Sequence, residues 1–219
     1  MGGRTRVKMC GITNSYDAEE AVSAGVDALG FIFVEESPRY VSPENARGII
    51  ANLPPFIDCV GVFVDRDPRE VEEIISYCGL SYVQLHGCEE AKYCERMARL
   101  TTPCKVIKAF RVGDDTQGEV FTPYNEVARG FLLDTYSQGL AGGTGMVFDW
   151  QIIERLRLQL PFILAGGLDP DNVREAIRQV RPFAIDVNSG VERTPGMKDE
   201  TKLHAFMEQV RLADQDQAD

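Results

Sequence analysis

The sequence has few basic residues for its number of acidic ones, and it has only two histidines. Lys and Arg total 23 against 34 Asp and Glu, so the formal net charge is −11. This balance argues against nucleic acid or an anionic membrane as the partner. With only His86 and His204, the chain has few residues from which to build a Ser-His-Asp triad or a histidine-based metal site. An anionic substrate would have to be held by local donors rather than by the field of the whole protein.

Long apolar segments are also missing. The chain has neither an apolar run of about 18 residues nor an N-terminal signal-like apolar region. Its 6 cysteines form no CxxC pair and no cluster with histidine at metal-ligand spacing. We therefore expect a cytoplasmic protein that contains no disulfide framework, no metal and no cofactor. Five cysteines are expected to be small, reduced, packed side chains: Cys59, Cys78, Cys88, Cys94 and Cys104.

Short apolar, β-branched runs alternate with helical patterns along the whole chain. The predicted strands are Val7–Cys10, Ala28–Phe33, Cys59–Val64, Tyr82–His86, Lys105–Phe110, Phe131–Asp134, Phe162–Ala165 and Ala184–Val187. Connections of this length make neighbouring strands parallel. Ser42-Pro43, Asp67-Pro68 and Asp169-Pro170 each place a cap residue before a first-turn proline. The pattern predicts a single-domain (β/α)8 TIM barrel over residues 1–213, followed by a polar tail, 214–219, that frays.

One segment of this barrel is expected to differ from the simple pattern. Residues 113–129 contain Pro123 and show little periodicity, which predicts an irregular or short helix there. The last helix is predicted over Glu200–Leu212.

The polar residues at the strand ends mark the expected site, because these ends meet at one mouth of the barrel. The ring consists of Cys10, Phe33, Asp65, His86, Arg111, Asp134, Gly166 and Asn188. Cys10 and Asp134 differ in acid–base chemistry, so a substrate between them could be deprotonated on one side and protonated on the other. His86 is expected to contact the substrate. On the residues alone, Cys10 can also be read as a packed small side chain and Asp134 as a helix cap.

Two glycine-rich turns, Gly166-Gly167 and Ser189-Gly190, follow the seventh and eighth strands. Backbone N–H groups at these positions form the phosphate-binding site of many barrels. The alternative is that the glycines serve only to form two tight turns. Arg39, in the Ser-Pro-Arg-Tyr loop after strand two, could hold a carboxylate with two parallel hydrogen bonds; the alternative is a solvated surface arginine. The loop 142–145 lacks the P-loop ending and is expected to line or close the mouth.

Strand alternation predicts an ion pair inside the barrel. Lys8 shares a face with Cys10, and Asp186 shares a face with Asn188. Because the first and eighth strands are neighbours in a closed barrel, Lys8 and Asp186 are expected to pair there; the alternative points Lys8 outward. The Lys8 charge is expected to lower the pKa of the Cys10 thiol. Asp186 is also expected to contact the substrate.

Seven motifs, in order and over nearly the whole chain, resemble the phosphoribosylanthranilate isomerase family. They are Arg6–Thr13, Ser37–Arg39, Val83–Gly87, Leu133-Asp134, Gly142–Gly145, Ala165–Leu168 and Asp186–Glu192. The resemblance implies an Amadori rearrangement of N-(5-phosphoribosyl)anthranilate to 1-(2-carboxyphenylamino)-1-deoxyribulose 5-phosphate in tryptophan biosynthesis, without a cofactor. It implies that Cys10 is the general base and Asp134 the general acid. It also implies that Arg39 lies near the anthranilate carboxylate and that the two glycine turns hold the phosphate. Met146 and Asn188 depart from the family, where Lys and Ser are usual.

Two other functions remain to be weighed. The sister barrel isomerase of histidine biosynthesis uses a carboxylate where this chain has Cys10, and it needs a second anion turn that 60–65 and His86-Gly87 do not supply. A sugar-phosphate sensor without catalysis would not need both Cys10 and Asp134. The oligomeric state is left open.

Overall fold

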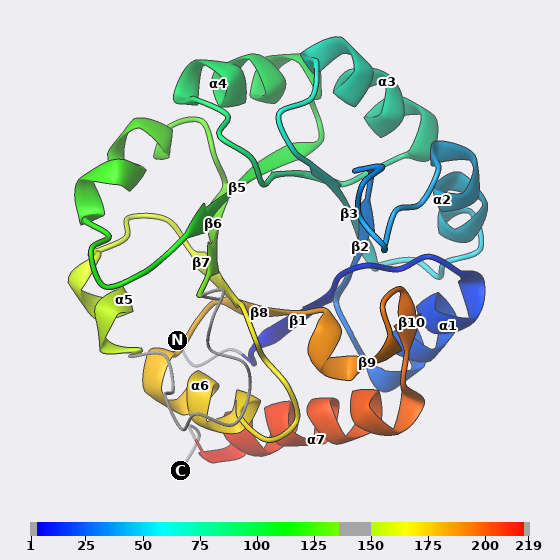
Figure 1. Ribbon diagram of the computed structural model, residues 1–219, viewed down its shortest axis with the longest axis vertical. Helices are drawn as coiled ribbons and strands as arrows, with labels where there is room; N and C mark the ends of the chain where they lie inside the picture. The colour runs from blue at the N-terminus through cyan, green and yellow to red at the C-terminus, as the bar shows by residue number, and fades with distance from the viewer. Residues whose placement is uncertain (1–3, 136–149, 217–219) are drawn as a thin grey trace.

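Eight parallel strands close into a barrel in the order of the chain, from β1 to β8 (Figure 1). The computed structural model describes residues 4–135 and 150–216. The strands are β1 Arg6–Met9, β2 Ala28–Ile32, β3 Asp58–Phe63, β4 Tyr82–Leu85, β5 Lys105–Arg111, β6 Gly130–Asp134, β7 Phe162–Ala165 and β8 Ala184–Val187. This confirms the predicted barrel. Every predicted strand is present, with its ends shifted by one residue at most.

Helices cover the outside of the barrel. They are α1 Ser15–Ala24, α2 Pro43–Ile50, α3 Pro68–Cys78, α4 Ala91–Leu100, α5 Gln151–Arg155, α6 Val173–Val180 and α7 Glu200–Asp216. Ser42 and Asp67 cap α2 and α3 through their side chains, as predicted. The third predicted cap is wrong: Asp169 accepts from the backbone N–H groups of Asp171 and Asn172 and so holds a turn in front of α6. The predicted short helix in 113–129 is the 3-10 helix η1, Gly118–Tyr124.

The C-terminal helix is longer than predicted. The expectation that the chain frays from residue 214 is wrong for residues 214–216, which belong to α7. The Asp214 carboxylate accepts from the backbone N–H and the hydroxyl of Thr5, at 3.0 and 2.7 Å. Asp216 pairs with Arg174 of α6 at 2.9 Å. These long-range contacts fix the end of α7 against the barrel, so its polar sequence does not make it fray.

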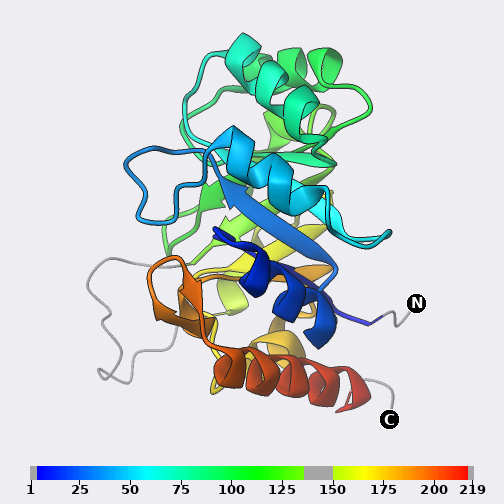
Figure 2. The same cartoon turned by 90° about the vertical axis from the view of Figure 1, so that its right-hand side faces the viewer.

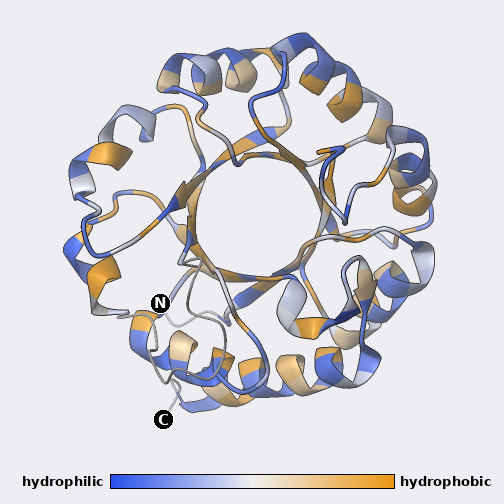
Figure 3. Ribbon diagram, in the orientation of Figure 1, coloured by the Kyte–Doolittle hydropathy of each residue, from blue (hydrophilic) through white to orange (hydrophobic). Residues whose placement is uncertain are grey.

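The main core fills the space between the barrel wall and the helices, and the apolar faces of the helices point toward the barrel (Figure 3). A smaller apolar cluster from β5 to β8 includes Ile107, Leu132 and Ile163. Cys59, Cys78, Cys94 and Cys104 are buried as predicted, and burial raises the pKa of each of these thiols. Cys88 contradicts the prediction. It is exposed in the turn between β4 and α4.

An insertion follows β8 at the mouth. It consists of the 3-10 helix η2, Ser189–Val191, and an antiparallel hairpin of β9 Glu192–Thr194 and β10 Met197–Lys198. Gly196 adopts φ +82° in the hairpin turn, a conformation that favours glycine. The hairpin and the loop between β2 and α2 extend on the same side of the barrel (Figure 2). This arrangement brings Arg39 of that loop to Glu192. Among the described residues, no helix combines the length and apolar character needed to span a membrane.

Candidate active site

Cys10 follows the last residue of β1 and is buried, and its backbone N–H donates to Val187 O at 2.9 Å. Gly30 on β2 makes room for its side chain: a Cβ atom there would lie 2.9 Å from the Cys10 sulfur and 3.0 Å from Lys8 Nζ. Both atoms therefore occupy the space beside one glycine. The sulfur is fixed next to an ammonium group at the C-terminal end of the strand, where barrel enzymes carry their chemistry.

The predicted ion pair inside the barrel is confirmed. Lys8 Nζ donates to Asp186 Oδ1 at 2.8 Å, and both side chains are buried. β1 pairs with β8 in a register that aligns these two residues. Burial lowers the pKa of Lys8, but Asp186 and Cys10 raise it by more, so the ammonium stays charged. The barrel therefore keeps a positive charge directly below Cys10.

The predicted effect of Lys8 on Cys10 is confirmed, but it does not decide the net shift of the thiol pKa. Lys8 does lower the pKa of the Cys10 thiol, as does Lys198. Burial acts in the other direction and is larger, so the pKa lies above its ordinary value. Desolvation outweighs one neighbouring cation because a thiolate inside the barrel loses its hydration.

Asp134 is the last residue of β6, and it is partly exposed at the mouth. Its carboxylate lies 3.6 Å from His86 Nε2. Gln84 Nε2 lies 2.8 Å from His86 Nδ1. When this amide donates to Nδ1, the imidazole proton is on Nε2 and faces Asp134. His86 and Asp134 thus form one polar unit across β4 and β6, which connects two residues that the sequence placed separately in the ring.

The two glycine turns meet. A Cβ atom on Gly190 would lie 1.9 Å from Leu168 O, so only glycine allows the turn after β8 to approach the turn after β7 this closely. Gly166 and Gly167 adopt φ +96° and +64°, and Ser189 is exposed beside them. The four predicted phosphate-binding residues therefore form one continuous surface. It lies between Asp134 on β6 and Cys10 on β1 in the barrel order.

Arg39 is not a solvated arginine. Its Nε donates to Glu192 Oε1 at 2.9 Å, and its Nη2 donates to Oε2 at 2.6 Å. The Glu192 carboxylate is buried, while Arg39 is about one-fifth exposed. This pair corrects the expectation that the fork is available as a whole: one edge of the guanidinium already binds protein. Within the described ranges no group accepts a hydrogen bond from Nη1.

The sequence analysis missed two buried cations. Lys198 Nζ donates to Glu192 and Asn188, and Lys108 Nζ pairs with Glu89 at 3.1 Å. Glu192 starts the hairpin after β8 and Glu89 lies in the loop between β4 and α4, and alternation along the barrel strands cannot give the spatial neighbours of either segment. The turn sequence at Pro195-Gly196 was the one available signal, because it predicts a hairpin that returns the chain to the mouth.

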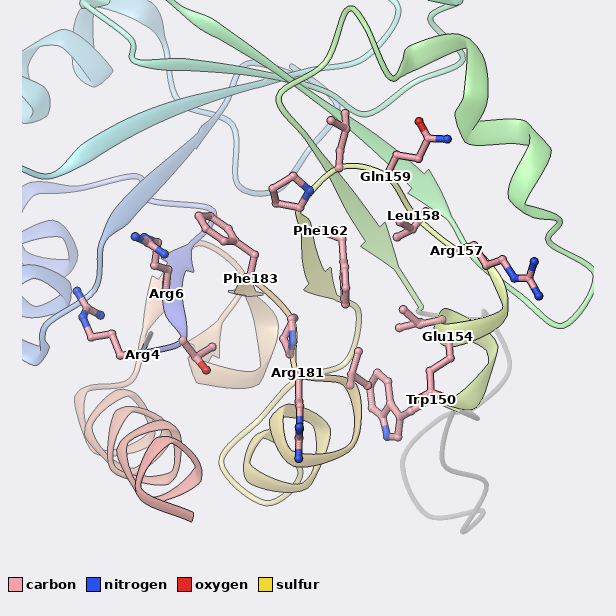
Figure 4. A pocket seen from close by; sticks show the side chains of 16 residues that line it. Arg4, Arg6, Trp150, Glu154, Arg157, Leu158, Gln159, Phe162, Arg181 and Phe183 are labelled. Carbon is pink, nitrogen blue, oxygen red and sulfur yellow. The ribbon is translucent and has the colours of Figure 1, made fainter. Parts of the chain in front are cut away.

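A hollow of about 920 Å³ lies at the other end of the barrel. Arg4, Arg6, Trp150 and Arg181 line it at the start of β1 and beside α6 (Figure 4). It holds neither of the predicted proton-transfer groups, and the N-terminal end of a barrel serves stability more often than chemistry. The predicted loop 142–145 and Met146 lie outside the described residues.

The comparisons with known proteins identify the family. The model of the family described as N-(5'phosphoribosyl)anthranilate (PRA) isomerase matches residues 7–209. The chain is similar to N-(5'-phosphoribosyl)anthranilate isomerase of Geobacter sulfurreducens, with 50% identity over 94% of this chain and 98% of the relative. It is also similar to the enzyme of the same name from Desulforudis audaxviator, with 48% identity over 95% and 99%.

Solved structures give the same result. The isomerase from Thermotoga maritima superposes with a TM-score of 0.84 at 44% identity, over 94% of this chain and 98% of that one. A second structure, a phosphoribosyl anthranilate isomerase in complex with reduced 1-(o-carboxyphenylamino)-1-deoxyribulose 5-phosphate, gives a TM-score of 0.83 at 43% identity over the same shares. On the barrel, the strand-end residues and these matches, the chain belongs to the phosphoribosylanthranilate isomerase family.

Proposed function

We propose that this protein is a phosphoribosylanthranilate isomerase that acts in tryptophan biosynthesis, in the cytoplasm, on a phosphorylated aminosugar. The observation that carries the proposal is the order of groups around the mouth. Asp134 on β6 and Cys10 on β1 flank the joined glycine turns after β7 and β8. A substrate whose phosphate lies on these turns would have its sugar carbons between an acid and a base.

The reaction leaves the atom count unchanged, and two proton transfers, one from Asp134 and one to Cys10, lead to its enolamine intermediate. Asp134, in its protonated form, donates to the furanose ring oxygen as the bond from that oxygen to C1′ breaks, which opens the ring to a Schiff base. The Cys10 thiolate then removes the proton from C2′, and the electron pair moves to the imine nitrogen to give an enolamine. The enolamine tautomerises to the aminoketone product. Neither step requires a metal or a redox cofactor.

The binding groups follow from the same placement. The backbone N–H groups of Gly166, Gly167, Ser189 and Gly190 are assigned to the phosphate. Arg39 is assigned to the anthranilate carboxylate through the edge that Glu192 does not occupy. His86 and Asp186 are assigned to the sugar hydroxyl groups, since each lies beside one of the two proton-transfer residues.

The alternatives are less well supported. The sister isomerase of histidine biosynthesis needs a carboxylate at the end of β1, where Cys10 stands. Its second anion turn would be expected near His86-Gly87, where the buried Lys108 is already paired with Glu89. A binding-only protein has no need for a cysteine held beside a buried lysine.

The test is turnover of the proposed substrate. The substrate is made in the cuvette from anthranilate and phosphoribosyl pyrophosphate by a phosphoribosyltransferase, and its consumption is followed by the loss of fluorescence. The expected result is accelerated loss with formation of an isomer of equal mass, identified by chromatography. If micromolar protein binds the product but the substrate is consumed no faster than in the spontaneous reaction, the protein is a sensor and not an enzyme.

A further inference from the structure

Lys198 is a buried lysine to which the reaction described above gives no role. Its side chain is 2% exposed. Its ammonium donates to Glu192 Oε1 at 3.2 Å, to Asn188 Oδ1 at 3.1 Å and to Asn188 O at 3.2 Å. Burial lowers the pKa of Lys198 by more than Glu192 and Cys10 raise it, so the pKa lies below its ordinary value. The three acceptors satisfy all three N–H groups of the ammonium, so Lys198 occupies a specific polar site in the protein interior.

Glu192 joins this cation to Arg39. The same carboxylate receives Lys198 on one oxygen and the fork of Arg39 on both, and the backbone N–H of Gly196 also donates to it at 3.3 Å. These groups come from β9, β10 and the β2–α2 loop, which the hairpin brings together (Figure 2). Lys198 therefore holds the residue that holds Arg39.

Asn188 links the same ammonium to the turn after Cys10. A Cβ atom on Gly11 would lie 2.7 Å from Asn188 Oδ1 and 2.9 Å from the Cδ atom of Arg39. Gly11 has φ +75°, so both its conformation and its close neighbours require glycine. The amide of Asn188 and the stem of Arg39 thus pack on the turn that carries the thiol. Serine, usual here in the family, has a shorter side chain.

The charges of this network do not cancel. The buried Glu192 carboxylate needs one cation, and Arg39 already supplies it with bidentate geometry. Lys198 adds a second, so the three side chains together carry one positive charge; the buried Asp17 carboxylate nearby accepts from the backbone N–H of Lys198 and not from its ammonium. The neighbouring pair of Lys8 and Asp186 is neutral. A buried surplus charge is costly unless an anion completes it, and the protein as a whole is acidic.

We propose that Lys198 is a positioning residue for the carboxylate of the substrate. It fixes Glu192, and through it Arg39, and it gives the network the single positive charge that the substrate carboxylate neutralises. This inference rests on the proposed function, because it takes the ligand to be an anthranilate derivative. A purely structural lysine would stabilise the hairpin and would not distinguish a ligand with a carboxylate from one without it.

The test is a cycle between protein and ligand, measured as dissociation constants. The two probes are the reduced product analogue with a 2-carboxyphenylamino group and its phenylamino counterpart, which lacks the carboxylate. Lys198→Met is expected to weaken binding of the first probe about tenfold and of the second by less than about twofold. Lys202→Met is the matched control. Lys202 donates to the backbone oxygen of Glu192 at 3.0 Å, and its loss is expected to change neither constant by more than about twofold.

Equal losses for both probes in Lys198→Met would overturn the inference in favour of a structural role. Lys198→Gln, whose amide can still donate to Asn188 and Glu192, gives the same comparison if the Met variant does not fold. Equal binding of both probes by the unsubstituted protein would overturn the inference without any variant. If that protein binds neither probe, the proposed function itself fails, which is a different result.

Discussion

At the residue scale, Cys10 is subject to opposing effects. Burial raises the pKa of its thiol, and Lys8 and Lys198 lower it. The thiolate is a stronger base than its ordinary pKa would make it, and the same burial that produces this strength limits its population. The nearby ammonium groups therefore favour the thiolate form that the burial of Cys10 opposes.

Lys8→Met is expected to raise the pH at which activity appears. The variant removes the largest effect that lowers the pKa of Cys10, so the thiolate forms only at higher pH. It also leaves Asp186 buried without its partner, which costs about 3–5 kcal/mol in the free energy of unfolding. The pH dependence of kcat and urea unfolding measure the two effects. An unshifted pH profile in a folded variant would assign the tuning of Cys10 to other groups. The double variant with Asp186→Asn should recover part of the lost stability.

Asp134→Asn is expected to lower kcat by roughly 10²–10⁴-fold, the usual effect of losing a general acid. The amide keeps the shape of the side chain and cannot donate a carboxylic acid proton to the ring oxygen. Steady-state turnover measures the loss, and unchanged affinity for the product analogue is the control for the fold. A kcat within a few-fold of the parent would remove Asp134 from the reaction.

The residue pairs differ in how far they could be predicted. Alternation along β1 and β8, with closure of the barrel, was enough for Lys8 and Asp186, because strand geometry fixes both faces. The partners of Lys198 and Lys108 come from the hairpin after β8 and from loops, and no period along the barrel strands relates such residues to the groups they reach. The net direction of the Cys10 pKa also could not be predicted, since it depends on the degree of burial and not on which neighbours are present.

At the element scale, the close contact of the two glycine turns is the feature most open to test. In Gly190→Ala the new methyl group would meet Leu168 O, so the turns must separate. We expect KM to rise roughly 10–100-fold. Gly48→Ala in α2 is the matched control, because no atom of the described residues lies within 4 Å of its new methyl group. Steady-state kinetics measure both variants. An unchanged KM in Gly190→Ala would show that the phosphate does not depend on this contact.

Helix and strand boundaries follow from local sequence where a cap or a glycine decides them. Ser42 and Asp67 fix the starts of α2 and α3 through their own side chains. The end of α7 does not follow from local sequence. Asp214 is held by Thr5, at the far end of the chain, and Asp216 is held by Arg174 of α6. A polar tail predicts fraying only when no such partner exists.

At the scale of the whole molecule, the two ends of the barrel have separate characters. The mouth holds the cysteine, the Asp134–His86 unit, the joined turns and a network with one surplus positive charge. The opposite end holds an arginine-lined hollow that contains neither Cys10 nor Asp134 (Figure 4). The protein as a whole carries a net charge of −11, so the positive charge that attracts an anionic substrate is the local one at the mouth.

The most direct test of the account is the turnover of N-(5-phosphoribosyl)anthranilate by Cys10→Ala, compared with the parent at equal protein concentration. Alanine removes the sulfur and leaves the turn, the glycines and the ion pairs in place. The account predicts that kcat falls by roughly 10²–10⁴-fold, with product affinity and thermal stability close to those of the parent. Near-parental turnover by the folded Cys10→Ala protein would contradict it.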